Sequence, residues 1–162
     1  KVGREYMLRD ICGAVAADYD HIVIDCPPAL GVLTLNALTA ATDIVVPVGL
    51  EVFSLQGLKQ LFATVDSVKR YCNPSLLVAG ILITRRGNRA SLTRELTDVI
   101  AQKAEELNVH LYGAVIREAV AVREAQVMQE SLFISHPKAA VTADYVAFID
   151  EYLTQEDEYH GD

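Results

Sequence analysis

The sequence contains few cysteines and no long hydrophobic run. Its three cysteines, Cys12, Cys26 and Cys72, form an odd count without a C-x-x-C pair. This pattern argues against a disulfide framework or a zinc site and favours a reducing compartment. No apolar run approaches the roughly 20 residues that a helix needs to cross a bilayer. We therefore expect a cytoplasmic protein that is not inserted in a membrane.

The sequence also lacks the common catalytic motifs. No glycine is followed by Lys and then Ser or Thr, so the phosphate-binding pattern G-x-x-x-x-G-K-[ST] is absent. The four histidines lie far apart and show no metal-ligand spacing, and no G-x-S-x-G nucleophile elbow is present. The 162 residues alone are therefore not expected to hold a nucleoside triphosphate in the usual way or to catalyse its hydrolysis.

Positive charge is scarce and unevenly placed. The formal net charge of −8 argues against a surface devoted to nucleic acid, although it permits a local basic patch. Four of the 14 basic residues fall within ten positions, at Arg85, Arg86, Arg89 and Arg94. The end of the chain is acidic, and we expect residues 154–162 to form a flexible tail behind a single domain of residues 1–153.

Apolar, β-rich runs alternate with helical patterns. The strands we predict are His21–Asp25, Asp43–Val48, Val78–Thr84 and Tyr112–Arg117. Apolar periodicity and stop signals predict helices at about Glu5–Ala17, Leu30–Ala41, Leu58–Val68 (ending near Asn73-Pro74), Leu92–Leu107 (with Ser91 as its cap), Val120–Glu130 and Lys138–Leu153. This alternation is typical of an α/β protein with a mostly parallel sheet flanked by helices.

The most informative segment is His21–Pro28, in which an apolar run ends in Asp25 and is followed by Cys26, Pro27 and Pro28. A run without polar alternation predicts a strand covered on both faces, with Asp25 at its carboxyl end. Open α/β sheets bind ligands at that end, and a carboxylate there suits a magnesium ion held through water. The alternative reading is an aspartate that caps the next helix. We interpret Cys26 as a small turn residue, because no activating base can be named for it.

These blocks resemble a known family. The segment Tyr19–Gly31 is similar to the Walker B and switch II region of ParA/Soj-type partition ATPases, which are deviant Walker A P-loop ATPases. Ile44–Val48, Gly80–Thr84 and the region around Val120 continue the likeness. The resemblance implies a P-loop NTPase-like three-layer sandwich. It also implies that the chain is the C-terminal two-thirds of such a protein, without its N-terminal P-loop unit.

The resemblance assigns roles to individual residues. It makes Asp25 the catalytic Walker B acid that orders the magnesium shell, and Pro27 and Pro28 the γ-phosphate-sensing switch. Thr84 and Arg85 would lie near the ATP base, and Arg117 occupies a loop that contacts adenine, although Arg117 and Ala119 replace the family's Pro and Asn. Arg89 matches a DNA-contacting arginine. A second such arginine is replaced by Ala121, for which Arg86 or Arg123 could compensate.

The resemblance further implies ATP and Mg²⁺ as cofactors of an intact parent protein. It implies a homodimer that binds nonspecific DNA on the nucleoid, a ParB-type partner, and a role in plasmid or chromosome partition. Two alternatives stay open at this point. One is a non-enzymatic ParA-like interaction module. The other is a MinD-like positioning ATPase, which the acidic C-terminus disfavours because those relatives end in a basic membrane-binding helix.

Overall fold

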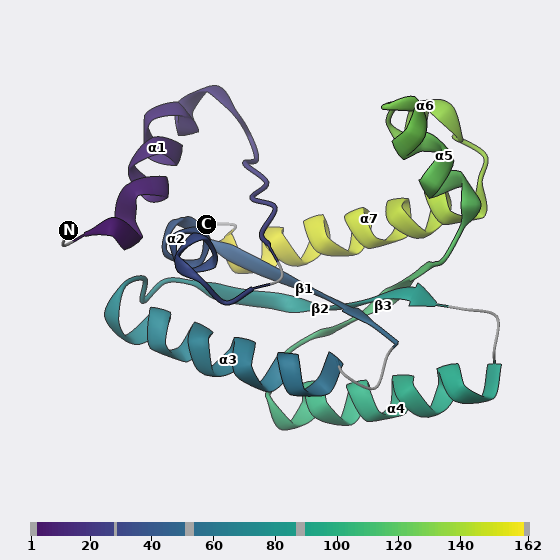
Figure 1. The fold of residues 1–162 in the computed structure, drawn as a ribbon, viewed down its shortest axis with the longest axis horizontal. Coiled ribbons are helices and arrows are strands. Elements are labelled where there is room, and N and C mark those ends of the chain that lie inside the picture. Colours follow the sequence, from purple (N-terminus) through teal and green to yellow (C-terminus); the bar gives the residue numbers. More distant parts are fainter. Residues whose placement is uncertain (1–2, 28, 51–53, 87–89, 161–162) are drawn as a thin grey trace. The chain divides into compact units, whose positions relative to one another are not determined.

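The structure is a computed structural model that describes residues 3–27, 29–50, 54–86 and 90–160 (Figure 1). Its helices and strands alternate as the sequence predicts. In chain order they are η1 Arg4–Tyr6, α1 Met7–Val15, η2 Ala16–Asp18, α2 Val32–Ala40, β1 Asp43–Gly49, α3 Ser54–Tyr71, β2 Leu77–Arg86, α4 Ala90–Glu106, β3 Leu111–Arg117, α5 Val120–Met128, α6 Leu132–Ser135 and α7 Ala140–His160.

The described strands form one sheet in the order β1-β2-β3, and β2 runs parallel to β3. This confirms the predicted α/β class with a parallel sheet. The chain divides into two compact units, Lys1–Ile44 with Leu55–Val78 (unit 1) and Val45–Ser54 with Ala79–Asp162 (unit 2). Strands β1 and β2 contribute residues to both units, which are described separately below.

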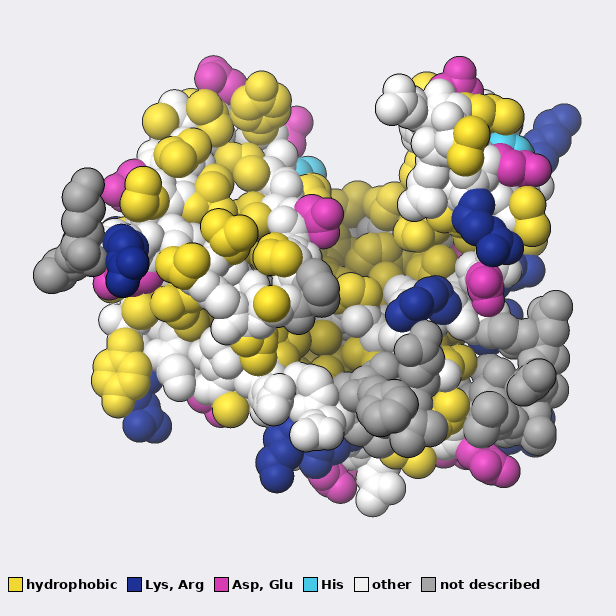
Figure 2. Space-filling view, viewed as in Figure 1, with side chains coloured by type: hydrophobic (Ala, Val, Ile, Leu, Met, Phe, Trp, Pro, Cys, Tyr) yellow, Lys and Arg dark blue, Asp and Glu magenta, His cyan; other side chains and the backbone are white. Residues whose placement is uncertain are grey.

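Unit 1 has a small helical core. Leu38 of α2 and Val65 and Val68 of α3 are buried together, as the helical spacing predicts, and Leu76 between α3 and β2 completes this core. The amide of Asn73 just after α3 donates hydrogen bonds to the carbonyl oxygens of Leu38 (3.1 Å) and Ala41 (2.7 Å) at the end of α2. Helix α1 contacts α2, and large hydrophobic side chains remain exposed along it (Figure 2), among them Met7, Ile11 and Val15.

Unit 2 is built around β2 and β3. Helix α7 packs over β3 and α4 lies on the opposite face of the sheet (Figure 1). The core on the α7 side contains the buried residues Leu82, Tyr112, Ile116 and Val141. A Cβ atom at Gly80 would lie 2.6 Å from the Tyr112 ring and 2.9 Å from the His110 carbonyl oxygen. Only glycine therefore allows the Tyr112 ring to cross β2 at this position.

Helix α7 also contacts the sheet through polar groups. The pairing register of β3 against β2 shifts between Leu111 and Val115, which marks an irregularity in the strand. There the carboxylate of Glu151 accepts hydrogen bonds from the backbone N–H groups of Gly113 (2.9 Å) and Ala114 (3.0 Å). The Glu151 carboxylate thus satisfies two strand donors that the shift would otherwise leave unpaired.

One predicted strand is wrong. Residues 21–25 form no strand in the structure, and Val23 and Ile22 are 92% and 42% exposed. A strand exists only when a neighbour supplies hydrogen-bond partners, and none of the described strands pairs with this segment. Apolar β-branched residues therefore give an extended but unpaired segment here, and Asp25 is not held at the rim of a strand.

Three further differences concern the C-terminal region and the start of α4. Helix α7 continues to His160, past the predicted end at Leu153. Tertiary contacts explain the extension, because the Gln155 amide donates to the Ala79 carbonyl oxygen (2.9 Å) and its oxygen accepts from the Tyr112 hydroxyl (3.0 Å). The short helix α6 was not predicted, and Ser91 lies inside α4 rather than before it.

Candidate functional site

The carboxyl ends of β2 and β3 bring together four of the residues singled out by sequence. Thr84, Arg85 and Arg86 end β2, and Arg117 ends β3. Arg86 is the register partner of Arg117, and the N–H of Glu118 donates to the Arg86 carbonyl oxygen at 3.2 Å. We call these four residues the C-terminal rim. Parallel strands place it at the edge where open α/β sheets bind ligands.

Arg85 has an unusual backbone. Its φ angle is 52°, in the left-handed region that non-glycine residues rarely adopt. A Cβ atom at Gly49, at the end of β1, would lie 3.0 Å from a guanidinium nitrogen of Arg85, so the side chain lies directly against the Gly49 backbone. Such conformations cost roughly 1–3 kcal/mol and cluster at binding and catalytic sites.

Arg117 is fixed by an acid on α7. The carboxylate of Asp144 accepts from the Arg117 guanidinium at 2.6 Å (Nε) and 2.7 Å (Nη2), and from the Arg117 backbone N–H at 3.1 Å. The Asp144 side chain is only 12% exposed. A bidentate pair of this kind fixes the orientation of the guanidinium. Two nitrogens of Arg117 are thereby occupied, and its side chain as a whole is 41% exposed.

The pairing shifts both ionisation equilibria. The hydrogen bonds from Arg117 lower the pKa of Asp144 despite partial burial, and Arg86 adds a smaller contribution in the same direction. The same bonds raise the pKa of Arg117. Sequence reasoning missed Asp144, although a signal was present. It is an acid within the buried stripe of the predicted C-terminal helix, between Val141 and Phe148 at helical spacing.

Asp25 and Pro27 belong to unit 1 and are exposed. The segment is connected to α2 by the hydroxyl of Thr34, which donates to the Ala29 carbonyl oxygen at 2.7 Å. Burial, and to a lesser degree the neighbouring Asp25, raises the pKa of the Cys26 thiol. A raised pKa disfavours the thiolate, which agrees with Cys26 being a turn residue and not a nucleophile.

The remaining predicted residues are dispersed or outside the described ranges. Arg86 is exposed on the C-terminal rim, and Arg123 is exposed on α5 within the same unit. Pro28 and Arg89 lie outside the described residues. The structure therefore brings together the predicted base-contacting residues Thr84, Arg85 and Arg117, whereas Asp25 and Pro27 belong to the other unit.

The donor set can be tested against the implied cofactors. Within residues 3–27, 29–50, 54–86 and 90–160, no three metal-binding side chains gather. A single carboxylate such as Asp25 still fits Mg²⁺, which keeps several waters and binds phosphate oxygens. The guanidinium groups of the C-terminal rim fit a ligand that offers acceptor atoms.

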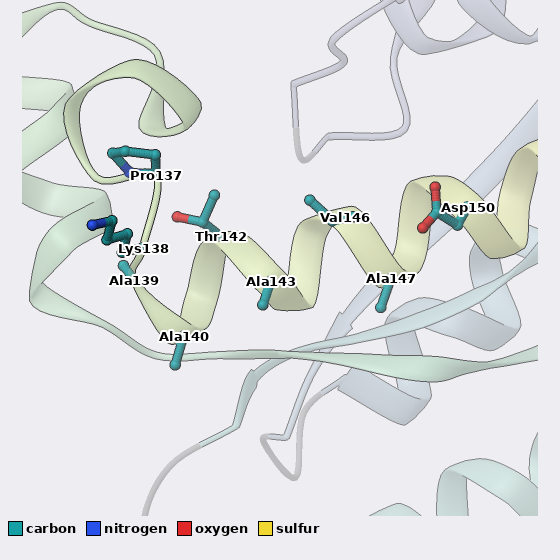
Figure 3. Close-up of a pocket in the computed structure, with 9 residues that line it drawn as sticks. All are labelled: Pro137, Lys138, Ala139, Ala140, Thr142, Ala143, Val146, Ala147 and Asp150. Atoms are coloured by element: carbon teal, nitrogen blue, oxygen red, sulfur yellow. The ribbon is translucent and has the colours of Figure 1, made fainter.

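A hollow of about 490 Å³ along α7 contains none of the predicted site residues (Figure 3). No helix of the described chain is both long and apolar enough to cross a membrane.

Comparisons with known proteins support the resemblance. A family model described as an AAA domain matches residues 1–78. The chromosome partitioning protein ParA of Myxococcus xanthus is 46% identical over 97 residues, covering 60% of this chain and 34% of that protein. The ParA of Caulobacter vibrioides is 36% identical over 156 residues, covering 94% of this chain and 57% of that protein. The chain thus spans about half the length of the curated relatives it matches.

The fold has close counterparts among solved structures. The cobyrinic acid a,c-diamide synthase of Mycobacterium smegmatis, crystallised with bound ADP and magnesium, superposes with a TM-score of 0.79 at 30% identity. That match covers 100% of this chain and 57% of the synthase. The sequence relatives and the shared α/β fold lead to one conclusion, which is that this chain is a member of the ParA-type family of P-loop ATPases.

Proposed function

We propose that this chain is part of a ParA-type ATPase that uses ATP-dependent dimerisation and nonspecific DNA binding to partition a plasmid or chromosome. The observation that carries the proposal is the similarity to a ParA protein along 94% of the chain. The C-terminal rim supports it, because Arg85 with its strained backbone and Arg117 with its fixed guanidinium end neighbouring strands at the edge where α/β sheets bind ligands. The protein would work in the cytoplasm on the nucleoid, as a homodimer with a ParB-type partner.

In the intact parent, the predicted site residues of this chain would have separate roles. Asp25 would order the water shell of Mg²⁺, and Pro27 and Pro28 would respond to the γ-phosphate. Thr84, Arg85 and Arg117 would face the base. Magnesium would neutralise charge on the phosphates, which a lysine-bearing loop outside this chain would hold. Arg86, Arg89 and Arg123 would contact DNA phosphates.

Hydrolysis is tested in the longer parent protein. We expect Asp25→Asn to lower magnesium-dependent ATP turnover by roughly 10- to 100-fold, the usual effect of disturbing a metal's ordered surroundings. Asp20→Asn is the matched control, because Asp20 is an exposed acid five positions earlier. Equal turnover in the two variants would contradict the role of Asp25. The 162-residue chain alone should show no turnover above background, and measurable turnover would refute that expectation.

DNA binding is tested by its salt dependence. Removing one arginine that binds a phosphate should reduce the slope of log affinity against log salt by about 1. We expect this change in Arg86→Ala and in Arg123→Ala of the ATP-bound parent, on any DNA sequence. Arg70→Ala, an exposed arginine at the end of α3, serves as the control. If the slope is unchanged in both Arg86→Ala and Arg123→Ala, neither arginine binds a DNA phosphate.

A further inference from the structure

Arg117 keeps a pair of hydrogen-bond donors that no group in the described part of the chain accepts. Its guanidinium group presents N–H donors in a rigid planar fork. Asp144 occupies the edge formed by Nε (2.6 Å) and Nη2 (2.7 Å). The other edge, formed by Nη1 and the second N–H of Nη2, has no partner among the described residues. Because this edge is as rigid as the first, it suits a ligand with two neighbouring acceptor atoms.

The surroundings of Arg117 on the C-terminal rim supply mostly donors. Arg85 and Arg86 end the neighbouring strand β2. Ala119 stands where the resemblance has an asparagine, so it brings no polar side chain, and it packs against the core on the α7 side. No side chain caps helix α5 after Ala119, so the first N–H groups of that helix also lack a side-chain acceptor. A base bound at this edge would therefore meet N–H donors.

The pairing with Asp144 decides which acceptors suit Arg117. A lone guanidinium group attracts carboxylates and phosphates through its charge. Here the Asp144 carboxylate, 12% exposed and 2.6 Å away, offsets that charge, so the pair attracts an anion less than a lone arginine does. The O6 and N7 atoms of guanine are neighbouring acceptors without charge, and an arginine fork binds both. Adenine carries an amino donor in place of O6.

These contacts indicate a preference among purines. We propose that the C-terminal rim accepts purine nucleotides with an oxo group at C6, such as GTP, at least as well as ATP. Arg117 binds the O6 and N7 atoms, and Asp144 is the positioning residue that fixes its guanidinium group. This base preference rests on the proposed nucleotide binding and specifies which purine the site takes. Adenine would set its amino donor against the donors of Arg117, and Ala119 offers no acceptor for it.

Equilibrium binding to the longer parent protein tests the base preference. The probes are ADP, GDP and IDP with Mg²⁺, which cannot be hydrolysed at a γ-phosphate during the measurement. IDP has the O6 and N7 atoms of guanine without its 2-amino group. We expect GDP and IDP to bind the wild type at least as tightly as ADP does. Arg117→Leu should weaken GDP and IDP about 10-fold or more, the usual effect of losing a bidentate contact to a base, while ADP changes far less.

Asp144→Asn tests the positioning role separately. An amide has one acceptor oxygen, so it cannot hold both Nε and Nη2 of Arg117 as the carboxylate does. We expect the ratio of the GDP to the ADP dissociation constant to rise toward its value in Arg117→Leu. Asp144→Glu, which keeps the carboxylate, should give a ratio closer to the wild type. A general loss of structure would weaken all three probes alike, so the ratio reports positioning and not stability.

The matched control is Glu118→Gln. Glu118 is an exposed acid directly after Arg117, and successive residues of an extended segment point to opposite sides. This variant should leave the ratio unchanged, and a change as large as that of Arg117→Leu would overturn the role of Arg117. Arg117→Leu weakening all three probes equally would also overturn it, because Arg117 would then not contact the base.

The same measurement separates the base preference from the proposed function. A wild-type parent that binds ADP, but binds GDP and IDP about 10-fold more weakly or worse, overturns the base preference and leaves the proposed function in place. A folded parent that binds none of the three probes overturns the proposed nucleotide binding, and the base preference with it.

Discussion

Asp144 holds Arg117 through two guanidinium hydrogen bonds of 2.6 and 2.7 Å, and also accepts the Arg117 backbone N–H. One carboxylate thereby connects the end of β3 to the N-terminal part of α7. Arg117, which stands where the resemblance to ParA has a proline, is thus the rim residue whose guanidinium orientation the structure fixes. We expect the connection to contribute to stability as well as to the geometry of the rim.

Asp144→Ala tests that contribution. The substitution removes charge-assisted hydrogen bonds from a largely buried position, so we expect the free energy of unfolding to fall by about 1–3 kcal/mol. Urea denaturation measures the change. Asp98→Ala is the matched control, because Asp98 is an exposed acid on α4. If both variants lose the same stability, the pair contributes nothing beyond an ordinary surface acid.

The acidity of Glu151 predicts a pH dependence. Burial alone would raise its pKa, but the hydrogen bonds from Gly113, Ala114 and His110 lower it below the ordinary 4.5. A carboxyl whose pKa is lower when folded stabilises the fold above its ordinary pKa, and this stabilisation is lost as the pH falls through the folded value. The stability difference between wild type and Glu151→Gln should therefore be largest above about pH 5 and shrink toward pH 2.

Urea denaturation of the two proteins at several pH values measures this difference. At pH 7 we expect Glu151→Gln to lose about 1–2 kcal/mol, because an amide oxygen replaces the carboxylate that accepts two strand N–H groups. Glu95→Gln on the exposed face of α4 should cost far less. A loss for Glu151→Gln that is constant from pH 7 to pH 2 would show that the charge of Glu151 is not the cause.

Two glycines should respond to alanine with opposite signs. At Gly80 the new Cβ atom would meet the Tyr112 ring and the His110 backbone at less than 3 Å, so Gly80→Ala should destabilise the protein by about 1–3 kcal/mol. Gly57 lies in helix α3 with no atom within 4 Å of the added Cβ. Gly57→Ala should stabilise by up to about 1 kcal/mol. Thermal melts of the two variants give the signs, and the same sign in both would contradict this account.

The left-handed backbone of Arg85 predicts a trade between stability and binding. Glycine adopts φ angles near 52° without the steric cost that arginine has. Arg85→Gly should therefore be more stable than Arg86→Gly by about 1 kcal/mol. In the parent protein Arg85→Gly should nevertheless bind nucleotide more weakly than the wild type. If Arg85→Gly is both the less stable variant and a normal nucleotide binder, the strain at Arg85 does not serve binding.

Several elements were predictable because their signals are local. Leu58, Val65 and Val68 recur at helical spacing and are buried in α3 as predicted. The unbroken apolar runs at 43–48, 78–84 and 112–117 are the strands of the sheet, because residues covered on both faces need no polar alternation. The arginines of the C-terminal rim could also be placed by sequence, since parallel strands end at one edge.

The features that the sequence predicted wrongly or missed depend on contacts between residues far apart in the chain. The apolar run at 21–25 reads as a strand, but Val23 is exposed because the described strands give it no hydrogen-bond partner. Asp144 and Glu151 meet groups 27 and 37–38 positions away in sequence, and Gln155 meets Ala79 across 76 positions. The sequence by itself determined the α/β class, most helices and strands, and the family. Only tertiary structure decided which segment is paired, where α7 ends and which acid holds Arg117, because hydrogen bonds between distant segments leave no periodic trace in the chain.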